Sequence, residues 1–273
     1  MSRKIQLARV LAKTPLHSIL RTAHRKLVRY IDAVENWENG DEATNGEAFL
    51  VRVAGPHLQV ALDIGANLGR WSLLLTGVNP RCRIHAFEAS PATFRSLTEN
   101  VRGFPLITPR SLGLGEREAT LEFLDYGANS GLSSFVSRKT TTGLSEERRV
   151  QVPVTTVDRF LAEVGAGTVD FVKIDTEGFE MAILRGMRGC LADRRVNFIQ
   201  FEYGGTWLDA KETLAGASEL LSGHGYHLFR LLPRGLERVI YRPLEHECFK
   251  YSNFAAVPSE EILQRWGIPV ATA

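Results

Sequence analysis

Acidic residues stand at the points where several predicted strands end. Asp63 closes the first of these strands and Glu88 the second, and Asp175 and Glu202 close two later ones. In an open parallel sheet, ligands bind beyond the carboxyl ends of the strands, where helix amino termini also point. We therefore expect one site at this edge of the sheet, built from residues 63–69, 88, 111–113, 175–178 and 202–205.

The segment 63–69 has the sequence Asp-Ile-Gly-Ala-Asn-Leu-Gly and connects a predicted strand to a predicted helix. A nicotinamide site would need Gly-x-Gly-x-x-Gly, but Asn67 and Arg70 stand where that pattern, started at Gly65, requires glycine. The pattern Asp-x-Gly-x-x-x-Gly suits S-adenosylmethionine instead. Its glycines would let the backbone pass close beneath the amino-acid portion of that cofactor, and Asp63 would supply negative charge near a cationic ligand.

A second acid completes the expected cofactor site. Glu88 stands 25 residues past Asp63, at the end of the second predicted strand, where its carboxylate can accept hydrogen bonds from both ribose hydroxyls. Residues after the third predicted strand belong to the same edge of the sheet. The predicted cofactor-binding residues are Asp63, Gly65, Asn67, Gly69, Glu88, Ser111 and Leu112.

Strands alternate with helices along most of the chain. Predicted strands cover residues 58–62, 83–88, 106–107, 119–124, 150–154, 169–174, 197–201, 226–231 and 237–241. The helices between them predict a mostly parallel sheet that is covered on both faces. The polar segment 127–147 is too long for an ordinary connection and predicts a functional lid or a disordered segment.

Three segments resemble the signatures of FkbM-type methyltransferases. They are Asp63–Gly69, Ala86-Phe87-Glu88-Ala89-Ser90-Pro91 and Lys173-Ile174-Asp175-Thr176-Glu177-Gly178-Phe179-Glu180. The resemblance covers about residues 45 to 257, including Asn45-Gly46-Glu47 and Tyr251-Ser252-Asn253-Phe254. The family usually has proline where Ala89 stands, a difference that should leave the ribose contact unharmed. The resemblance implies a class I methyltransferase fold, α/β and Rossmann-like, with a mostly parallel seven-stranded sheet, and S-adenosyl-L-methionine as methyl donor.

The resemblance also implies O-methylation of a hydroxyl on a sugar, a glycolipid or a secondary metabolite. Such a hydroxyl is a poor nucleophile, so a positioned group must take its proton as the methyl moves. Asp175, Glu177 and Glu202 are candidates for that group, and Lys173 could tune or pair with them. Crowded carboxylates raise one another's pKa, which would suit a base that works near neutral pH.

Other roles stay open for several of these residues. Glu177 and Glu180 could instead place negative charge at a helix amino terminus, and either strand-end acid could position the acceptor or contact the cofactor. His246 is a further catalytic candidate because late loops in this fold close over the acceptor side. Asn253 could reach the site from the last strand or could be a turn residue. The His, Asp and Cys residues lack metal-ligand spacing, so no metal is expected.

Two other functions also stay open. One is methylation of a nitrogen in a nucleic acid or a protein, although residues 175–178 differ from the Asn/Asp-Pro-Pro-Tyr/Phe pattern common in amino-methylating enzymes of nucleic acids. The other is a cofactor-binding module without turnover. Acids at the ends of several predicted strands argue against that second alternative.

The charges are distributed unevenly along the chain. Of the 33 lysines and arginines, eight lie in the first 31 residues, which contain no acid, and the rest of the chain has 25 basic residues against 31 acidic ones. An acidic body argues against nucleic acid as a partner. We expect a basic, amphipathic helical arm over residues 1–40 and a methyltransferase domain over residues 41–273. Either the arm packs across the domain with its basic face solvated, or residues 1–30 contact anionic lipid head groups.

Further features of the sequence bear on location. It contains no run of about 18 apolar residues, so a transmembrane helix is not expected. Lys13, Pro15 and His17 interrupt what could otherwise be a signal-peptide core. The three cysteines are widely spaced, which fits a reducing cytoplasm. We expect a cytoplasmic protein with a small-molecule, glycan or glycolipid acceptor, and peripheral membrane contact through the arm as the open alternative.

Overall fold

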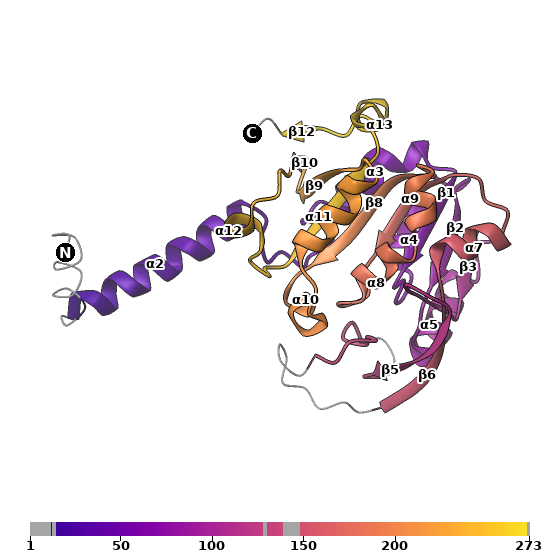
Figure 1. Cartoon of the computed structure of the whole chain (residues 1–273), viewed down its shortest axis with the longest axis horizontal. Helices are drawn as coiled ribbons and strands as arrows, with labels where there is room; N and C mark the ends of the chain where they lie inside the picture. Colours follow the sequence, from indigo (N-terminus) through magenta and orange to yellow (C-terminus); the bar gives the residue numbers. More distant parts are fainter. Residues whose placement is uncertain (1–11, 13–14, 128–129, 139–147, 272–273) are drawn as a thin grey trace.

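A nine-stranded sheet lies at the centre of the part of the chain that the structure describes (Figure 1). The structure is a computed structural model that describes residue 12 and residues 15–127, 130–138 and 148–271. From one edge to the other, the strands are β12 (Val270–Ala271), β10 (Gly235–Arg238), β9 (His227–Leu232), β11 (Ser252–Val257), β8 (Val196–Tyr203), β7 (Val169–Ile174), β1 (Val60–Ile64), β2 (Arg83–Phe87) and β3 (Ile107–Arg110).

The strand directions are those of a class I methyltransferase, as expected from the sequence. Strands β3, β2, β1, β7 and β8 run parallel, and β11 runs antiparallel between β8 and β9. The sheet has nine strands instead of the expected seven. The two additional strands extend one edge, because β10 pairs with β9 in a hairpin and β12 adds to β10.

Side chains that alternate along the strands build two hydrophobic cores, one on each face of the sheet. On β1, Val60, Leu62 and Ile64 belong to a core that is completed by α7 (Val157–Glu163), α8 (Glu180–Arg185), α9 (Arg188–Ala192) and α11 (Leu214–Gly223). Ala61 belongs to the other core, which is completed by α3 (Glu47–Ala54), α4 (Arg70–Val78), α5 (Pro91–Val101) and α13 (Glu260–Trp266). The predicted covering of both faces is confirmed.

A side-chain cap fixes the start of α5, which leaves only a short turn between this helix and the end of β2. Ser90 Oγ accepts a hydrogen bond from the Thr93 backbone N–H at 3.2 Å, and Pro91 occupies the first helical position. Proline is favoured there because its missing N–H would have no partner in the helix. Strand β2 therefore ends at Phe87, and Glu88 lies in the short turn before the helix.

A small second sheet contains β4 (Gly113–Leu114), β5 (Ala119–Asp125) and β6 (Arg148–Thr155). An isolated bridge between Leu124 and Ser134 joins it to the segment 130–138. Ser134 Oγ donates to the carbonyl of Thr176 at 3.2 Å and to that of Glu177 at 2.9 Å. This part of the predicted lid thus lies against the loop after β7, and its remaining residues, 128–129 and 139–147, lie outside the described residues.

The first helix within the described residues projects from the rest of the structure (Figure 1). This helix is α2 (Pro15–Val34), and its large apolar side chains are exposed. The interpretation that the arm packs across the domain therefore does not hold for these residues. Within the described ranges, no helix combines the length and the apolar character that crossing a bilayer requires. The remaining short helices are η1 (Gly55–His57), α10 (Gly205–Ala210) and α12 (Pro243–His246).

Candidate active site

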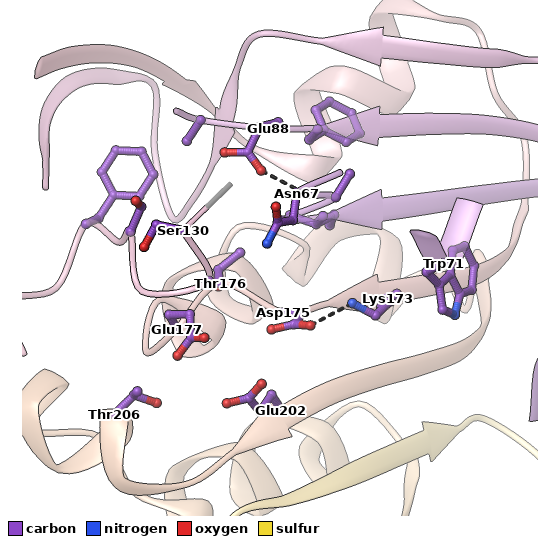
Figure 2. Close-up of a pocket in the computed structure, with 18 of the residues that line it drawn as sticks. Asn67, Trp71, Glu88, Ser130, Lys173, Asp175, Thr176, Glu177, Glu202 and Thr206 are labelled. Carbon is purple, nitrogen blue, oxygen red and sulfur yellow. Dashed lines mark hydrogen bonds and ion pairs between the residues drawn. The ribbon is translucent and has the colours of Figure 1, made fainter. Parts of the chain in front are cut away.

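A cavity of about 660 Å³ lies at the carboxyl ends of β1, β2, β7 and β8 (Figure 2). All five segments that the sequence assigned to this edge contribute residues to its wall. The parallel strands deliver the loop after β1, Glu88, the loop after β7 and Glu202 to one place. The expected single site is therefore present in the fold.

The glycines of the loop after β1 are required by packing within the protein. Gly65 and Gly69 have φ angles of 80° and 79°, in the left-handed region that favours glycine. A Cβ at Gly65 would lie 1.8 Å from the carbonyl oxygen of Asp175, and one at Gly69 would lie 2.8 Å from a methyl carbon of Leu97. The sequence predicts that these glycines admit the cofactor, but the close approaches seen here are to the residue after β7 at Gly65 and to α5 at Gly69.

The Gly65→Ala variant is expected to lower the free energy of unfolding by roughly 2–4 kcal/mol, because the new methyl group must displace the Asp175 carbonyl. Chemical denaturation measures this loss. Gly77→Ala is the matched control, since a Cβ at Gly77 meets nothing within 4 Å and alanine favours the α4 helix. Equal stability of the two variants would contradict the explanation.

Glu88 connects the two loops on the cofactor side. Its Oε2 accepts the Asn67 backbone N–H at 2.9 Å, and its Oε1 accepts the Ser90 backbone N–H at 2.8 Å. Burial raises the pKa of Glu88 to about 7, although both hydrogen bonds act to lower it. Each oxygen keeps a second lone pair, and Glu88 lines the cavity. The carboxylate can therefore hold the loop and still accept hydrogen bonds from a ribose.

Asp63 lies behind the cavity wall. It is fully buried, and its Oδ2 accepts a hydrogen bond from Ser72 Oγ at 2.7 Å. Burial raises the pKa of Asp63, and the nearby Lys173 charge opposes that shift. The negative charge of Asp63 would thus act on a cationic ligand from a distance, without contact. This role of Asp63 stays a prediction.

The third strand contributes one of the two residues assigned to it. Leu112 lines the cavity, whereas Ser111 is exposed at the surface. We therefore remove Ser111 from the cofactor-binding candidates and keep Leu112.

An ion pair occupies the floor of the acceptor side. Lys173 Nζ lies 2.8 Å from Asp175 Oδ2 (Figure 2). Burial acts to raise the pKa of Asp175, but the Lys173 charge and hydrogen bonds from Lys173 and Glu202 lower it overall. Burial likewise acts to lower the pKa of Lys173, and the surrounding acids Asp175, Asp63 and Glu47 raise it well above its ordinary value. Both members of the pair are therefore charged at neutral pH.

Two further acids complete a cluster with Asp175. Carboxylate oxygens of Asp175, Glu177 and Glu202 lie within 4.8 Å of one another. Burial and the Asp175 charge raise the pKa of Glu177 to about 8 and that of Glu202 well above its ordinary value. Arg138 pairs with Glu177 at 3.0 Å. The ionised Asp175 carboxylate therefore lies beside two acids whose pKa values are raised.

The distances within this cluster would also permit a metal ion. The sequence groups these three acids as candidate bases, but their spacing along the chain is not that of metal ligands. However, Lys173 and Arg138 already pair with two of the three carboxylates. A divalent cation would have to displace both, so the absence of a metal stays our prediction.

Glu180 holds the loop that carries Glu177. Its Oε1 accepts the backbone N–H groups of Thr176 at 2.9 Å and of Gly178 at 3.1 Å. The side chain is buried, and it stands at the start of α8. Of the roles left open for Glu180, the structure supports the one at the helix amino terminus. Burial raises its pKa to about 7.

Stability is expected to fall as pH rises from 6.5 to 8. Glu88, Glu177 and Glu180 have pKa values of about 7 to 8 in the folded protein against an ordinary value of 4.5, so the folded state binds their protons more tightly. The stability linked to these protons is complete below 4.5 and is lost as pH passes the folded values. His85, whose pKa burial lowers to about 4 from 6.5, opposes this trend only below about 6.5.

Urea unfolding at several pH values measures this dependence. The Glu180→Gln variant removes one of the three titrating groups and should show a shallower decline. Stability that stays constant or rises between pH 6.5 and 8 in the unmodified chain would contradict the assignment.

Glu47 is a cavity residue that our site prediction missed. Its carboxylate accepts hydrogen bonds from Asn45 at 2.8 Å, from Asn253 at 3.0 Å and from Gln200 at 3.0 Å. Asn253 therefore lies on β11 as a support for Glu47, and it is not a turn residue. The 206 residues between Asn253 and Glu47 leave no spacing signal. The family resemblance includes the segments 45–47 and 251–254, but it does not indicate that they contact each other.

On the acceptor side, the structure removes one residue from the predicted site and adds another. His246 lies on α12, where its Nδ1 contacts the Arg242 backbone, away from the cavity, so we no longer count it as a proton acceptor. Thr206 lines the cavity, and its buried Oγ1 has no hydrogen-bond partner within the described ranges. Figure 2 shows this hydroxyl pointing toward Glu202.

The cavity residues fit the expected methyl donor. Asn67 Oδ1 and Trp71 Nε1 are buried without a hydrogen-bond partner among the described residues, and both side chains belong to residues of the cavity wall. Buried polar atoms of this kind call for a ligand partner. Asn67, Trp71, Glu88 and Leu112 would hold S-adenosylmethionine, which supplies an electrophilic methyl group when it is bound.

Comparisons with known proteins agree with this geometry. The family model described as Methyltransferase FkbM domain matches residues 63–228. That span begins at Asp63 near the end of β1 and includes the loop after β1, Glu88 and the acid cluster.

Three relatives carry names that bear on chemistry. Methyltransferase 1 of Beauveria bassiana is 29% identical over 181 residues, which are 60% of this chain and 71% of the relative. Hexuronic acid methyltransferase AglP of Haloferax volcanii is 27% identical over 144 residues, 52% of this chain and 55% of the relative. The 2-O-methyltransferase NoeI of Sinorhizobium fredii is 25% identical over 189 residues, 65% of this chain and 76% of the relative.

Proposed function

Since the chain belongs to the FkbM methyltransferase family and is thus an S-adenosylmethionine-dependent methyltransferase, we propose that it methylates a hydroxyl group of a sugar. The observation that carries the proposal is the cluster of Asp175, Glu177 and Glu202, whose oxygens lie within 4.8 Å of one another in the cavity wall. A sugar presents several neighbouring hydroxyls, which such a cluster can bind through hydrogen bonds.

Asp175 is the proton acceptor in this proposal. Lys173 keeps its carboxylate ionised, so an acceptor hydroxyl can donate a hydrogen bond to it and pass it the proton as the methyl–oxygen bond forms. Glu202 donates a hydrogen bond to Asp175, and Glu177 is paired with Arg138. Their remaining oxygens can accept hydrogen bonds from other hydroxyls of the same sugar. Thr206 Oγ1 offers a further buried polar contact.

The names of two relatives support this choice of acceptor. AglP is a hexuronic acid methyltransferase, and NoeI is a 2-O-methyltransferase. A hexuronic acid also carries a carboxylate, and Arg138 on the segment 130–138 would supply the positive charge to meet it. A hexuronic acid or its glycosides are therefore the acceptors to test first.

The test incubates the purified chain with methyl-labelled S-adenosylmethionine and separate hexuronic acid glycosides, tRNA and an unmodified protein mixture. We expect label in the sugar, and mass spectrometry should locate it on a ring oxygen. Label on a nitrogen of the RNA or the protein would replace our proposal with that activity. Donor binding without transfer to any acceptor would instead favour a cofactor-binding module.

A further inference from the structure

We infer that α2 docks on the surface of an anionic membrane. The contact surface is the apolar face of α2, which consists of seven large side chains, Leu16, Ile19, Leu20, Leu27, Tyr30, Ile31 and Val34. Their spacing of three and four residues places them on one side of the helix. They are between 42% and 68% exposed. An apolar surface of this extent marks a site of interaction.

The rest of the protein touches a different side of this helix. Lys250 Nζ lies 2.5 Å from Asp32 Oδ1, and Val28, one turn earlier, is half-buried. At 3.6 residues per turn, Val28 and Asp32 lie roughly 140° around the axis from the centre of the apolar face of α2. The helix therefore keeps its attachment to the protein while its apolar face is open to a partner, and it projects from the sheet (Figure 1).

The charges on α2 favour a membrane over a second copy of the chain. Arg21, Arg25 and Arg29 follow one another at four-residue spacing, and Lys26 flanks the apolar face. The one acid of the helix, Asp32, is already paired with Lys250. Two such helices would repel each other, whereas each basic residue near an anionic lipid surface strengthens binding about fivefold. Arg21, Arg25 and Arg29 lie on the side of the helix opposite the apolar face. A basic polar face opposite an apolar face is also the pattern of helices that lie in the membrane interface.

The helix is attached at the rim of the cavity. Six residues after Val34 the chain reaches Gly40, which lines the cavity together with Glu42. That stretch spans at most about 21 Å. The backbone of Glu38 pairs with the carbonyl of Tyr251 at 2.9 Å, and Tyr251 also lines the cavity. Docking of α2 would therefore hold the cavity near the lipid surface. This step rests on the proposed function and identifies the acceptor as a sugar hydroxyl of a glycolipid.

Sedimentation of the full chain with vesicles tests the docking. We expect binding to phosphatidylcholine vesicles that contain phosphatidylglycerol, little binding to pure phosphatidylcholine, and weaker binding as salt screens the charges. The Leu20→Asn/Leu27→Asn variant should bind about tenfold or more weakly, and so should Arg21→Gln/Arg25→Gln. Thr22→Asn, on the polar side of the same helix, is the matched control and should bind normally.

Several results would overturn the docking. Equal sedimentation with both kinds of vesicle, or none with either, would contradict an anionic membrane as the partner. A dimer in analytical ultracentrifugation that Leu20→Asn/Leu27→Asn dissociates, without vesicle binding, would assign the apolar face of α2 to self-association. Calorimetry with S-adenosylmethionine on each variant verifies that the domain is folded.

A kinetic experiment tests the acceptor class. An alkyl hexuronoside carried in anionic vesicles should be methylated with a higher kcat/KM than the soluble hexuronic acid, and Leu20→Asn/Leu27→Asn should lose that gain. Equal rates on both acceptors would overturn the glycolipid assignment. Methyl transfer to a soluble sugar without vesicle binding would support the proposed function and contradict the docking of α2. Vesicle binding without methyl transfer to any hydroxyl would support the docking and contradict the proposed function.

Discussion

Replacing Asp175 with asparagine is expected to lower kcat by about a hundredfold to ten-thousandfold, the usual range for loss of a positioned general base. Asparagine keeps the shape of the side chain but cannot take a proton from the acceptor. Steady-state kinetics with a methylated sugar as product measures the loss, and calorimetry should show that the affinity for S-adenosylmethionine changes little.

The charge of Lys173 complicates this experiment, because Asp175→Asn leaves a buried ammonium without its 2.8 Å partner. Lys173→Met/Asp175→Asn removes both charges and should be folded but equally inactive. Asp193→Asn makes the same chemical change at an exposed position at the end of α9 and should keep full activity. Substantial turnover by the folded double variant would exclude Asp175 as the proton acceptor.

Replacing Glu88 with alanine is expected to weaken binding of S-adenosylmethionine by about a hundredfold or more. The variant loses a charged acceptor for the ribose, and each such hydrogen bond contributes about 1.5–3 kcal/mol. It also leaves the backbone N–H groups of Asn67 and Ser90 without their present partner. Isothermal titration calorimetry measures the affinity directly.

The pH dependence of donor binding offers a second test of Glu88. Its pKa of about 7 predicts that affinity falls as pH decreases below 7, because the protonated carboxyl is a weaker acceptor. Glu88→Gln should bind weakly at every pH and lose this dependence. Glu122→Ala, which removes an exposed acid on β5, is the control and should bind as the unmodified chain does. Unchanged affinity in Glu88→Ala would remove Glu88 from the cofactor site.

The two halves of the site meet in a close backbone contact. Gly65, in the cofactor loop, packs so closely on the Asp175 carbonyl that a side chain cannot fit between them. The residue that we expect to take the proton is therefore held directly against the loop that we expect to hold the donor. Such a contact fixes the separation of the two functions without any flexible element, which favours transfer in a defined geometry.

Local sequence was sufficient to predict the edge of the sheet where the cavity lies. Asp63, Glu88, Asp175 and Glu202 each mark the end of a parallel strand, and parallel strands bring their carboxyl ends together. The Gly-containing loop and the Ser90–Pro91 helix start were predictable for the same reason, since both depend on backbone preferences of single residues. The sequence could not provide the support of Glu47 by Asn253, because contacts across 206 residues depend on the pairing of β8 with β11.

The acids at this edge of the sheet thus have different roles that only the tertiary structure decides. Glu88, Asp175 and Glu202 line the cavity, and Asp63 lies behind it, while Glu180 at the start of α8 holds a loop. Sequence determines which residues reach this edge of the sheet, because strand ends and the helices that connect parallel strands are visible as local patterns. Burial, the position of Lys173 and the packing of neighbouring loops determine which of these acids are ionised and which face a ligand, and those properties exist only once the chain has folded.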